Sequence, residues 1–272
     1  MTPEEPTPPP PQYAPPAPQQ PQKPKNVVER VVGAIVAAGA ALVKYGAILV
    51  KLKFFTLFFS MLASVGAYAL AFGWQFAVGF VLLIFVHEMG HVIVLRARGI
   101  KAGLPVFLPF MGAFVSMKES PKSVYDEALS GIAGPVFGAA GAFVVLGLAG
   151  YEDSDFLRAL AYTGFLLNLF NLMPFLPLDG GRTAAAVNPK LWIVGLVGLL
   201  GYEVWRPSPI IPLILVFGGM EAYRRFKGRN TEASRQYYTL TPQQRLNIGT
   251  AYLGLIALLI WAMHTYPVPG RP

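Results

Sequence analysis

The sequence predicts an all-α polytopic membrane protein with about six transmembrane helices, an N-terminal interfacial amphipathic helix and a short re-entrant or extended, β-like segment. Three observations support this fold class. Hydrophobic residues make up 54% of the 272 residues and charged residues only 13%, about half the share usual in soluble domains. Several apolar runs approach the length of a membrane span. Lysine and arginine cluster beside these runs, as they do at cytoplasmic helix ends.

Four regions follow from changes in composition along the chain. Residues 1–26 hold 11 of the 25 prolines and no apolar run, which predicts a disordered, Pro-rich tail. Residues 27–53 carry basic side chains at seven-residue spacing, which predicts an interfacial amphipathic helix, with a true membrane span as the alternative. Residues 54–183 form a transmembrane core that contains the polar motifs, and residues 184–272 form a C-terminal transmembrane region.

The core is predicted to combine long apolar helices with one irregular segment. Residues 54–72, 75–95 and 128–150 are predicted spans because each is apolar over about 20 residues. Residues 156–173 are a further predicted span, which ends in a Pro-rich turn. Residues 101–122 contain prolines and glycines within an apolar stretch, which favours a re-entrant or extended segment packed against protein.

The C-terminal region is predicted to hold two short spans at 191–204 and 210–220, with a re-entrant hairpin as the alternative, and a last span at 246–264. Arg96 and Arg98 directly follow the second core span, which indicates that this end faces the cytoplasm. We therefore expect an integral, multi-pass protein of the plasma membrane whose polar motifs lie toward the cytoplasm.

One predicted span carries ionisable groups that are costly to place in lipid. Its sequence HEMGH puts His87 and His91 four residues apart on one helical face, where both imidazoles can bind one metal ion. Glu88 lies beside the first histidine and can act as a general base on a water at the metal. The chain has only three histidines, and two of them fall in this pattern, which argues against a chance match.

A catalytic zinc site needs a third protein ligand and one open position. His264 is expected at the opposite membrane face, whereas Glu119 and Glu127 border the segment that follows the motif. Asp179 has the most suitable setting, because prolines interrupt the preceding helix and two glycines allow close approach. The same aspartate could instead cap a helix that begins at DGGRTAAA, so ligand and cap are both open on spacing alone.

Two other classes of protein compete with a hydrolase. A transporter or channel could use the His/Glu cluster as a proton or metal relay, although no internal repeat pairs the halves of the sequence. A non-catalytic membrane scaffold would need neither the metal ligands nor the glutamate. The net charge of +8 is explained by membrane topology, so no nucleic-acid partner is expected. The absence of cysteine excludes thiolate ligands and disulfides.

Two motifs together resemble the site-2 protease family of intramembrane zinc metalloproteases. They are HEMGH, within one apolar helix, and NLFNLMPFLPLDGGR further along the chain. GAFVSMKE, AGPVFGAAGA and the spacing between the two motifs extend the resemblance over residues 54–182. The sequence contains no PDZ or CBS domain of the kind that many relatives carry, so the substrate selection and nucleotide sensing of those domains are not expected.

The resemblance implies a role for each polar residue of the motifs. His87, His91 and Asp179 are the implied ligands of one zinc ion. Glu88 is the implied catalytic acid and base. Asn171 is implied to orient the substrate or the developing oxyanion.

The resemblance also implies that the substrate is a transmembrane protein or peptide, cut within or near its span. A helical substrate must unwind before its peptide bond can react, and pairing along a strand edge is one way to hold it open. Residues 106–117, VFLPFMGAFVSM, could supply that edge, with Gly112 allowing close backbone approach. The alternative is that this segment only fills the bundle.

Overall fold

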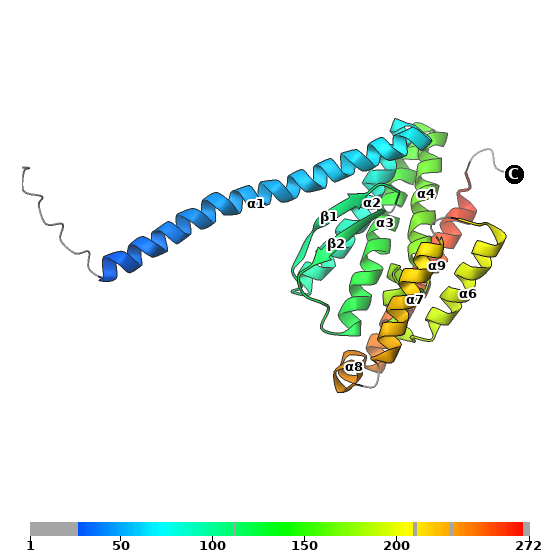
Figure 1. Cartoon of the computed structure of the whole chain (residues 1–272). Helices are drawn as coiled ribbons and strands as arrows, with labels where there is room; N and C mark the ends of the chain where they lie inside the picture. The colour runs from blue at the N-terminus through cyan, green and yellow to red at the C-terminus, as the bar shows by residue number, and fades with distance from the viewer. Residues whose placement is uncertain (1–26, 111, 209–210, 229–230, 269–272) are drawn as a thin grey trace, which may run out of the picture. The chain divides into compact units, whose positions relative to one another are not determined.

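The computed structural model describes residues 27–110, 112–208, 211–228 and 231–268, so the predicted Pro-rich tail lies outside the described residues. Within these ranges the chain forms nine helices and one two-stranded antiparallel sheet (Figure 1). Contacts between residues divide the chain into two units, residues 1–50 and 51–272. The elements are α1 (Val27–Phe72), α2 (Trp74–Ala97), β1 (Ala102–Leu108), β2 (Gly112–Met117), α3 (Val124–Glu152), α4 (Asp155–Asn171), α5 (Asp179–Val187), α6 (Leu191–Trp205), α7 (Ile211–Lys227), α8 (Glu232–Tyr237) and α9 (Pro242–Thr265).

Four helical segments in the described part of the chain are long and apolar enough to cross a membrane. They are Lys51–Phe72 in α1, Trp74–Ala97 (α2), Val124–Tyr151 in α3 and Pro242–Thr265 (α9). The other predicted spans correspond to α4, α6 and α7, with 17, 15 and 17 residues. A 17-residue helix is only about 26 Å long, slightly less than the hydrocarbon core. The chain is thus a mostly helical membrane protein with four candidate spans, and the expected count of six is not confirmed.

Helix α1 continues through residue 53, where the sequence predicts a boundary between an interfacial helix and the first span. The segment contains no proline, and alanine, leucine and lysine, which favour helix, are frequent along it. Nothing in the local sequence therefore ends the helix at that boundary. The interfacial position of residues 27–53 stays a prediction.

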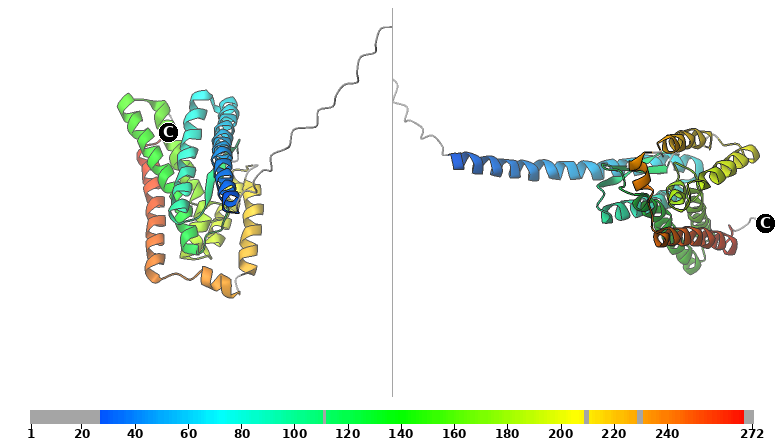
Figure 2. Two further views of the ribbon diagram at one scale, coloured as in Figure 1. Left: turned by 90° about the vertical axis from the view of Figure 1, so that its left-hand side faces the viewer. Right: turned by 90° about the horizontal axis from the view of Figure 1, so that it is seen from below.

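Helices α2, α3 and α4 pack side by side, and α9 lies against α3 and α4 (Figures 1 and 2). Small residues at the crossings make this packing possible. A side chain at Gly90 would collide with the backbone of Ala133, and one at Gly164 would press against Ala142. Phe165 is fully buried in the cluster that these helices form. Membrane helices use such small-residue interfaces because close packing replaces the hydrophobic driving force that lipid does not provide.

Side-chain caps set the start of three of the long helices. Ser123 at α3 and Ser154 at α4 each accept a hydrogen bond from an amide three residues further on. Thr241 begins α9 with a reciprocal capping box. The cap at Ser123 fixes the first turns of α3, which hold Glu127 and Ser130, and the carbonyl of Ser130 contacts His91 of α2.

The segment 101–122 forms a β-hairpin beside α2, in agreement with its prediction as an extended segment. Leu108 of β1 lies opposite Gly112 of β2. Gly112 has a φ of +87°, a conformation that side chains with L chirality rarely adopt, which explains a glycine at this turn. The amide of Phe107 donates to the hydroxyl of Ser60 in α1 (3.2 Å), which ties β1 to the first candidate span.

Two long-range hydrogen bonds hold α5 and the turn before it. Tyr252 of α9 donates its hydroxyl to the carbonyl of Leu172 (2.5 Å), and the indole of Trp192 donates to the carbonyl of Gly181 (2.7 Å).

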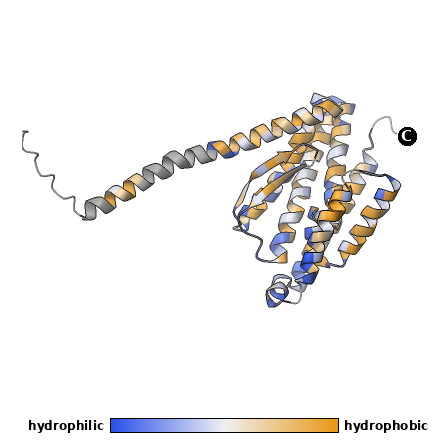
Figure 3. Cartoon of the chain, viewed as in Figure 1, coloured by the Kyte–Doolittle hydropathy of each residue, from blue (hydrophilic) through white to orange (hydrophobic). Residues whose placement is uncertain are grey.

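Hydrophilic residues gather at the end of the bundle that carries α8, whereas the helices between the ends are predominantly hydrophobic (Figure 3).

Candidate metal centre

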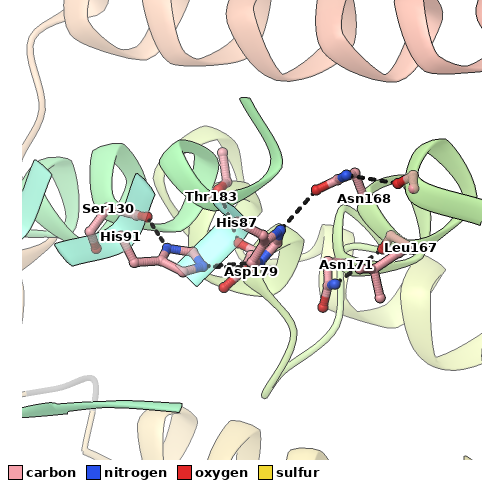
Figure 4. A network of polar contacts seen from close by, with 9 residues as sticks. His87, His91, Ser130, Leu167, Asn168, Asn171, Asp179 and Thr183 are labelled. Carbon is pink, nitrogen blue, oxygen red and sulfur yellow. Dashed lines mark hydrogen bonds and ion pairs between the residues drawn. The ribbon is translucent and has the colours of Figure 1, made fainter. Parts of the chain in front are cut away.

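Three side chains from two helices converge inside the bundle (Figure 4). His87 and His91 project from α2, and Asp179 is the first residue of α5. Oδ2 of Asp179 lies 3.0 Å from Nε2 of His87 and 3.2 Å from Nε2 of His91, and the two nitrogens are 3.2 Å apart. All three residues are buried. The fold therefore brings the three predicted ligands to one point, although Asp179 is far from the histidines in sequence.

Hydrogen bonds on the far side of each imidazole fix which ring nitrogen carries the proton. The side chain of Asn168 donates to the carbonyl of Gly164 (2.7 Å), so its Oδ1 faces Nδ1 of His87 at 2.8 Å. The carbonyl of Ser130 lies 2.6 Å from Nδ1 of His91. Both oxygens can only accept, so each Nδ1 donates. In the neutral rings, both Nε2 lone pairs therefore point toward the aspartate carboxylate.

This donor set fits one zinc ion. Zinc binds nitrogen and oxygen at about 2.0–2.1 Å, which in a tetrahedral shell separates neighbouring ligand atoms by roughly 3.3 Å. The separations of 3.0, 3.2 and 3.2 Å between the three ligand atoms are close to this spacing. Gly134 of α3 also fits, because a Cβ atom there would collide with Nε2 of both imidazoles. Three protein ligands leave one position for a water or a substrate atom.

Glu88 follows the first histidine in α2 and is only 8% exposed. Among the described residues, no hydrogen bond or ion pair involves its carboxylate. A buried carboxylate without a fixed partner is costly, so a contribution to stability does not explain its place next to His87.

The start of α5 bears on the two alternatives for Asp179. Leu178 occupies the N-cap position, and no side chain caps this helix. The carboxylate of Asp179 faces the two imidazoles instead. Gly180 and Gly181 allow α5 to approach the turn at residues 172–176, because a Cβ at either position would overlap the backbone of that turn. The glycines of the LDGG sequence thus bring the aspartate to the histidines.

The other candidate ligands lie elsewhere. Glu119 is exposed and forms an ion pair with Lys101 at 3.7 Å. Glu127 is buried, but its carboxylate binds α7 and α8. His264 lies in the last turn of α9. In the part of the chain that the structure describes, the potential metal-binding group consists of the two histidines of α2 and Asp179.

Two predicted substrate-binding residues do not touch the ligand atoms. Asn171 donates to a carbonyl one turn earlier in α4 (3.0 Å), and Gly112 lies at the hairpin turn. Asn168 contacts His87 instead (Figure 4), a residue that the sequence reasoning missed. The two asparagines are three residues apart, and only the rotation of α4 decides which one faces α2. The signal that could have found Asn168 is Gly138, since a Cβ there would collide with its amide.

A second buried polar group, the Glu127 cluster, consists of Glu127, Glu221, Arg225 and Tyr237. The carboxylate of Glu127 accepts hydrogen bonds from both terminal nitrogens of Arg225 (2.9 and 2.7 Å) and from the hydroxyl of Tyr237 (2.6 Å). Burial and the adjacent carboxylate raise the pKa of Tyr237, so its hydroxyl keeps the proton that it donates. The hydroxyl of Ser130 binds the carbonyl of Glu127 (2.8 Å), which links this cluster to the serine whose carbonyl holds the second histidine.

Residues 75–153, which contain the HEMGH motif and the hairpin, match peptidase family M50, the family of the site-2 proteases. This stretch of the chain is therefore similar to the site-2 proteases. It is similar to a zinc metalloprotease of Methanocaldococcus jannaschii, with 37% identity over 122 residues, 42% of this chain and 35% of the relative. It is also similar to Rip3 of Mycobacterium tuberculosis, a protein assigned as a zinc metalloprotease, with 28% identity over 176 residues, 59% of this chain and 43% of the relative.

The chain thus spans less than half the length of these relatives. Asp179 lies beyond the stretch that matches the family model, and it joins the histidines only through the fold.

Proposed function

We propose that the chain is an intramembrane zinc metalloprotease that hydrolyses peptide bonds within or near the transmembrane segments of membrane proteins. The observation that carries this proposal is the meeting of two Nε2 lone pairs and one carboxylate beside Glu88, a buried acid with no hydrogen bond or ion pair among the described residues. Such a donor set suits zinc, and an adjacent carboxylate suits acid–base chemistry. The names of the two relatives support the same chemistry.

In this proposal His87, His91 and Asp179 hold one zinc ion, and Glu88 is the catalytic acid and base. When bound, zinc supplies Lewis-acid chemistry that activates water at neutral pH and polarises the peptide carbonyl. The carboxylate of Glu88 accepts a proton from the attacking water and delivers it to the nitrogen of the leaving amine. Its burial keeps bulk solvent away from the proton while it is held.

Two supports keep the proposed ligands in the productive orientation. Asn168 holds the ring of His87, and the carbonyl of Ser130 holds the ring of His91. Each support accepts a hydrogen bond from the Nδ1–H group, so the proton stays on Nδ1 and Nε2 remains available for the metal. Such supports commonly change metal affinity or activity by about 10–100-fold when they are lost.

The proposed substrate is a transmembrane protein or peptide that unwinds and pairs along the hairpin. β1 and β2 form a sheet of two strands among the described residues, so each strand has one edge without a strand partner. An amide of β1 binds Ser60, which favours β2 as the edge for substrate. Open space surrounds Gly112, which permits close backbone approach. Asn171 uses one amide proton within α4, which leaves its oxygen and its other proton for the substrate.

The proposed location is the plasma membrane, with about six spans and the metal centre toward the cytoplasm. In this arrangement α4 crosses the bilayer together with the four longer helices, and α6 and α7 form either a further pair of short spans or a re-entrant hairpin. Basic residues in the last turns of α2 and α7 support a cytoplasmic position for those ends. Acidic residues around the turn between α3 and α4 support an external position for that turn.

Hydrolysis of single-span model peptides by the purified chain, loaded with zinc in detergent, tests the proposal. We expect Glu88→Gln to lower turnover by at least about 100-fold while the bound zinc remains. Glu119→Gln is the matched control, because this acid is exposed and pairs only with a surface lysine. Wild-type protein that folds but retains no stoichiometric transition metal, or Glu88→Gln with normal turnover, would overturn the assignment. Comparison of membrane fractions from cells that make either form would then identify natural substrates.

A further inference from the structure

A cavity of about 370 Å³, lined by several polar and charged side chains, includes Ser130 and Arg182, which are close in sequence or in contact with the candidate metal centre. Its wall combines the end of β2 with parts of α3, α5, α7 and α8. The lining residues that determine its chemistry are Met117, Ser130, Arg182, Arg225 and Tyr237. No step of the proposed hydrolysis uses this cavity, so its function needs a separate explanation.

Three lining residues connect the cavity to the site. The carbonyl of Ser130 accepts the hydrogen bond from His91 (2.6 Å). Arg182 follows Asp179 by three residues in α5, just under one helical turn. Met117 is the last residue of β2. A peptide that extends along β2 toward this strand end therefore leads into the cavity.

The cavity contains two arginines, and only one of them forms ion pairs among the described residues. Arg225 binds the carboxylates of Glu127 (2.7 Å) and Glu221 (2.9 Å). Arg182 makes no hydrogen bond or ion pair within the part of the chain that the structure describes. Glu127, the acid that lines the cavity with it, is bound by Arg225. The N–H groups of the Arg182 guanidinium are therefore available to bind a carboxylate that enters the cavity, with two parallel hydrogen bonds.

The surroundings of Arg182 favour a peptide over a lipid as the source of that carboxylate. Ser120, Pro121 and Ser234 also line the cavity, and they lie in segments between or beyond the long apolar helices. These segments belong to the hydrophilic end of the bundle (Figure 3). We therefore expect a ligand to reach the cavity along the end of β2 rather than across an apolar helix face.

We propose that Arg182 binds an acidic side chain of the substrate, a few residues to the cytoplasmic side of the bond that is cut. Arg182 is then a specificity-determining residue, and it selects substrates with Asp or Glu at that position. A lysine or arginine there would bind less well, because it would meet Arg182 as a like charge. The inference rests on the proposed proteolytic function and deepens it by naming a substrate class.

The test compares single-span model peptides that differ at one residue. Each peptide carries Asp, Asn or Lys at one of several consecutive positions on the cytoplasmic side of the span, and kcat/KM is measured with the full chain in detergent. At one position we expect Asp to exceed Lys by about tenfold, the effect of one partly screened charge pair. The ratio should approach one in Arg182→Gln, persist in Arg182→Lys and reverse in Arg182→Glu. Arg224→Gln is the matched control, because Arg224 is an exposed arginine of α7 that does not line this cavity.

The ratio between peptides is independent of total activity, so a variant that is less active remains informative. No charge preference in the wild type, or a preference that persists in Arg182→Gln, would overturn the inference. An equal loss of activity on all three peptides would show that Arg182 does not act through the charge of the substrate and would also overturn it. If Arg182→Gln does not fold, loss of the wild-type preference at high salt supports the ion pair, and a salt-independent preference contradicts it. Failure of the proteolytic assignment itself gives a different result, because no peptide would then be cut.

Discussion

The metal centre and the Glu127 cluster are two buried groups of charged side chains near the same part of α3, and they differ in how their carboxylates are compensated. Glu127 accepts three hydrogen bonds, two from Arg225 and one from Tyr237. Asp179 faces two imidazoles whose Nδ1 protons are used elsewhere, by Asn168 and the carbonyl of Ser130. The hydrogen bonds of the Glu127 cluster are complete within the protein. The metal centre instead has three electron-pair donor atoms that face one another.

This difference shows that burial of charged side chains does not by itself mark a functional site. A cluster whose donors and acceptors match is explained by structure. A cluster whose N–H groups all point away from its centre, and whose lone pairs point toward it, is explained by a cation at that centre. The contrast can be tested with variants in each cluster and in the residues that support the metal centre.

The largest effect is expected for Asp179→Asn, which removes a charged ligand and keeps the side-chain volume. Zinc affinity should fall by more than the roughly 100-fold that loss of a supporting hydrogen bond can cost. Metal content after dialysis against a graded chelator series measures this. Glu127→Gln is the paired variant and should retain its zinc. Equal zinc loss in both variants would contradict the distinction between the clusters.

The second effect concerns stability rather than metal. Glu127→Gln should lower the free energy of unfolding by about 3 kcal/mol, because Arg225 would lose its buried counter-charge. Replacing both partners, as Glu127→Leu with Arg225→Met, should recover most of this loss, since the only carboxylate then left without Arg225 is that of Glu221, which is partly exposed to solvent. Unfolding in detergent followed by circular dichroism provides the measurement. A double variant less stable than Glu127→Gln would show that the ion pair contributes more than mutual neutralisation.

The third effect separates the two asparagines of α4. Asn168→Ala should weaken zinc binding by about 10–100-fold, because His87 loses the acceptor that fixes its tautomer. Asn171→Ala should leave zinc binding unchanged, because its amide binds a backbone carbonyl within its own helix. If Asn171 orients substrate as proposed, that variant should instead lower the cleavage of model peptides. The reverse pattern of metal affinities would mean that α4 is rotated relative to α2.

The smallest effect is expected for Tyr237→Phe, which removes one of the three hydrogen bonds to Glu127. A loss of about 1–2 kcal/mol in unfolding free energy is expected, the usual cost of a hydrogen bond to a charged group. Tyr238→Phe is the matched control, because its hydroxyl makes no hydrogen bond among the described residues. Zinc content should be unchanged in both. A large loss of zinc in Tyr237→Phe would reveal stronger coupling through Ser130 than the geometry suggests.

The sequence alone was sufficient for much of the site, for identifiable reasons. The four-residue spacing of His87 and His91 has only one meaning on a helix, since both side chains then share a face. The prolines and glycines around Asp179 indicated a turn, and the glycines of that turn contact backbone in the structure. The extended form of residues 101–122 was predictable because prolines exclude a long helix there.

The remainder depended on contacts between segments that are distant in sequence. The choice of Asn168 over Asn171 beside His87 is set by the rotation of α4 against α2 and α3. The partners of Glu127 come from α7 and α8, about a hundred residues later. The number of spans could not be predicted from the sequence either, because apolar helices of 15 to 17 residues are near the minimum length for crossing a bilayer.

The sequence by itself determined the local patterns: apolar helices in a membrane chain, two imidazoles on one helical face and a proline- and glycine-rich turn that leads to an aspartate. The tertiary structure decided where the aspartate meets the histidines, which nitrogen of each ring is free, and which buried acid is neutralised by an arginine. The physical reason is that helical periodicity is a property of neighbouring residues, whereas the direction of a hydrogen bond depends on partners that only folding brings together.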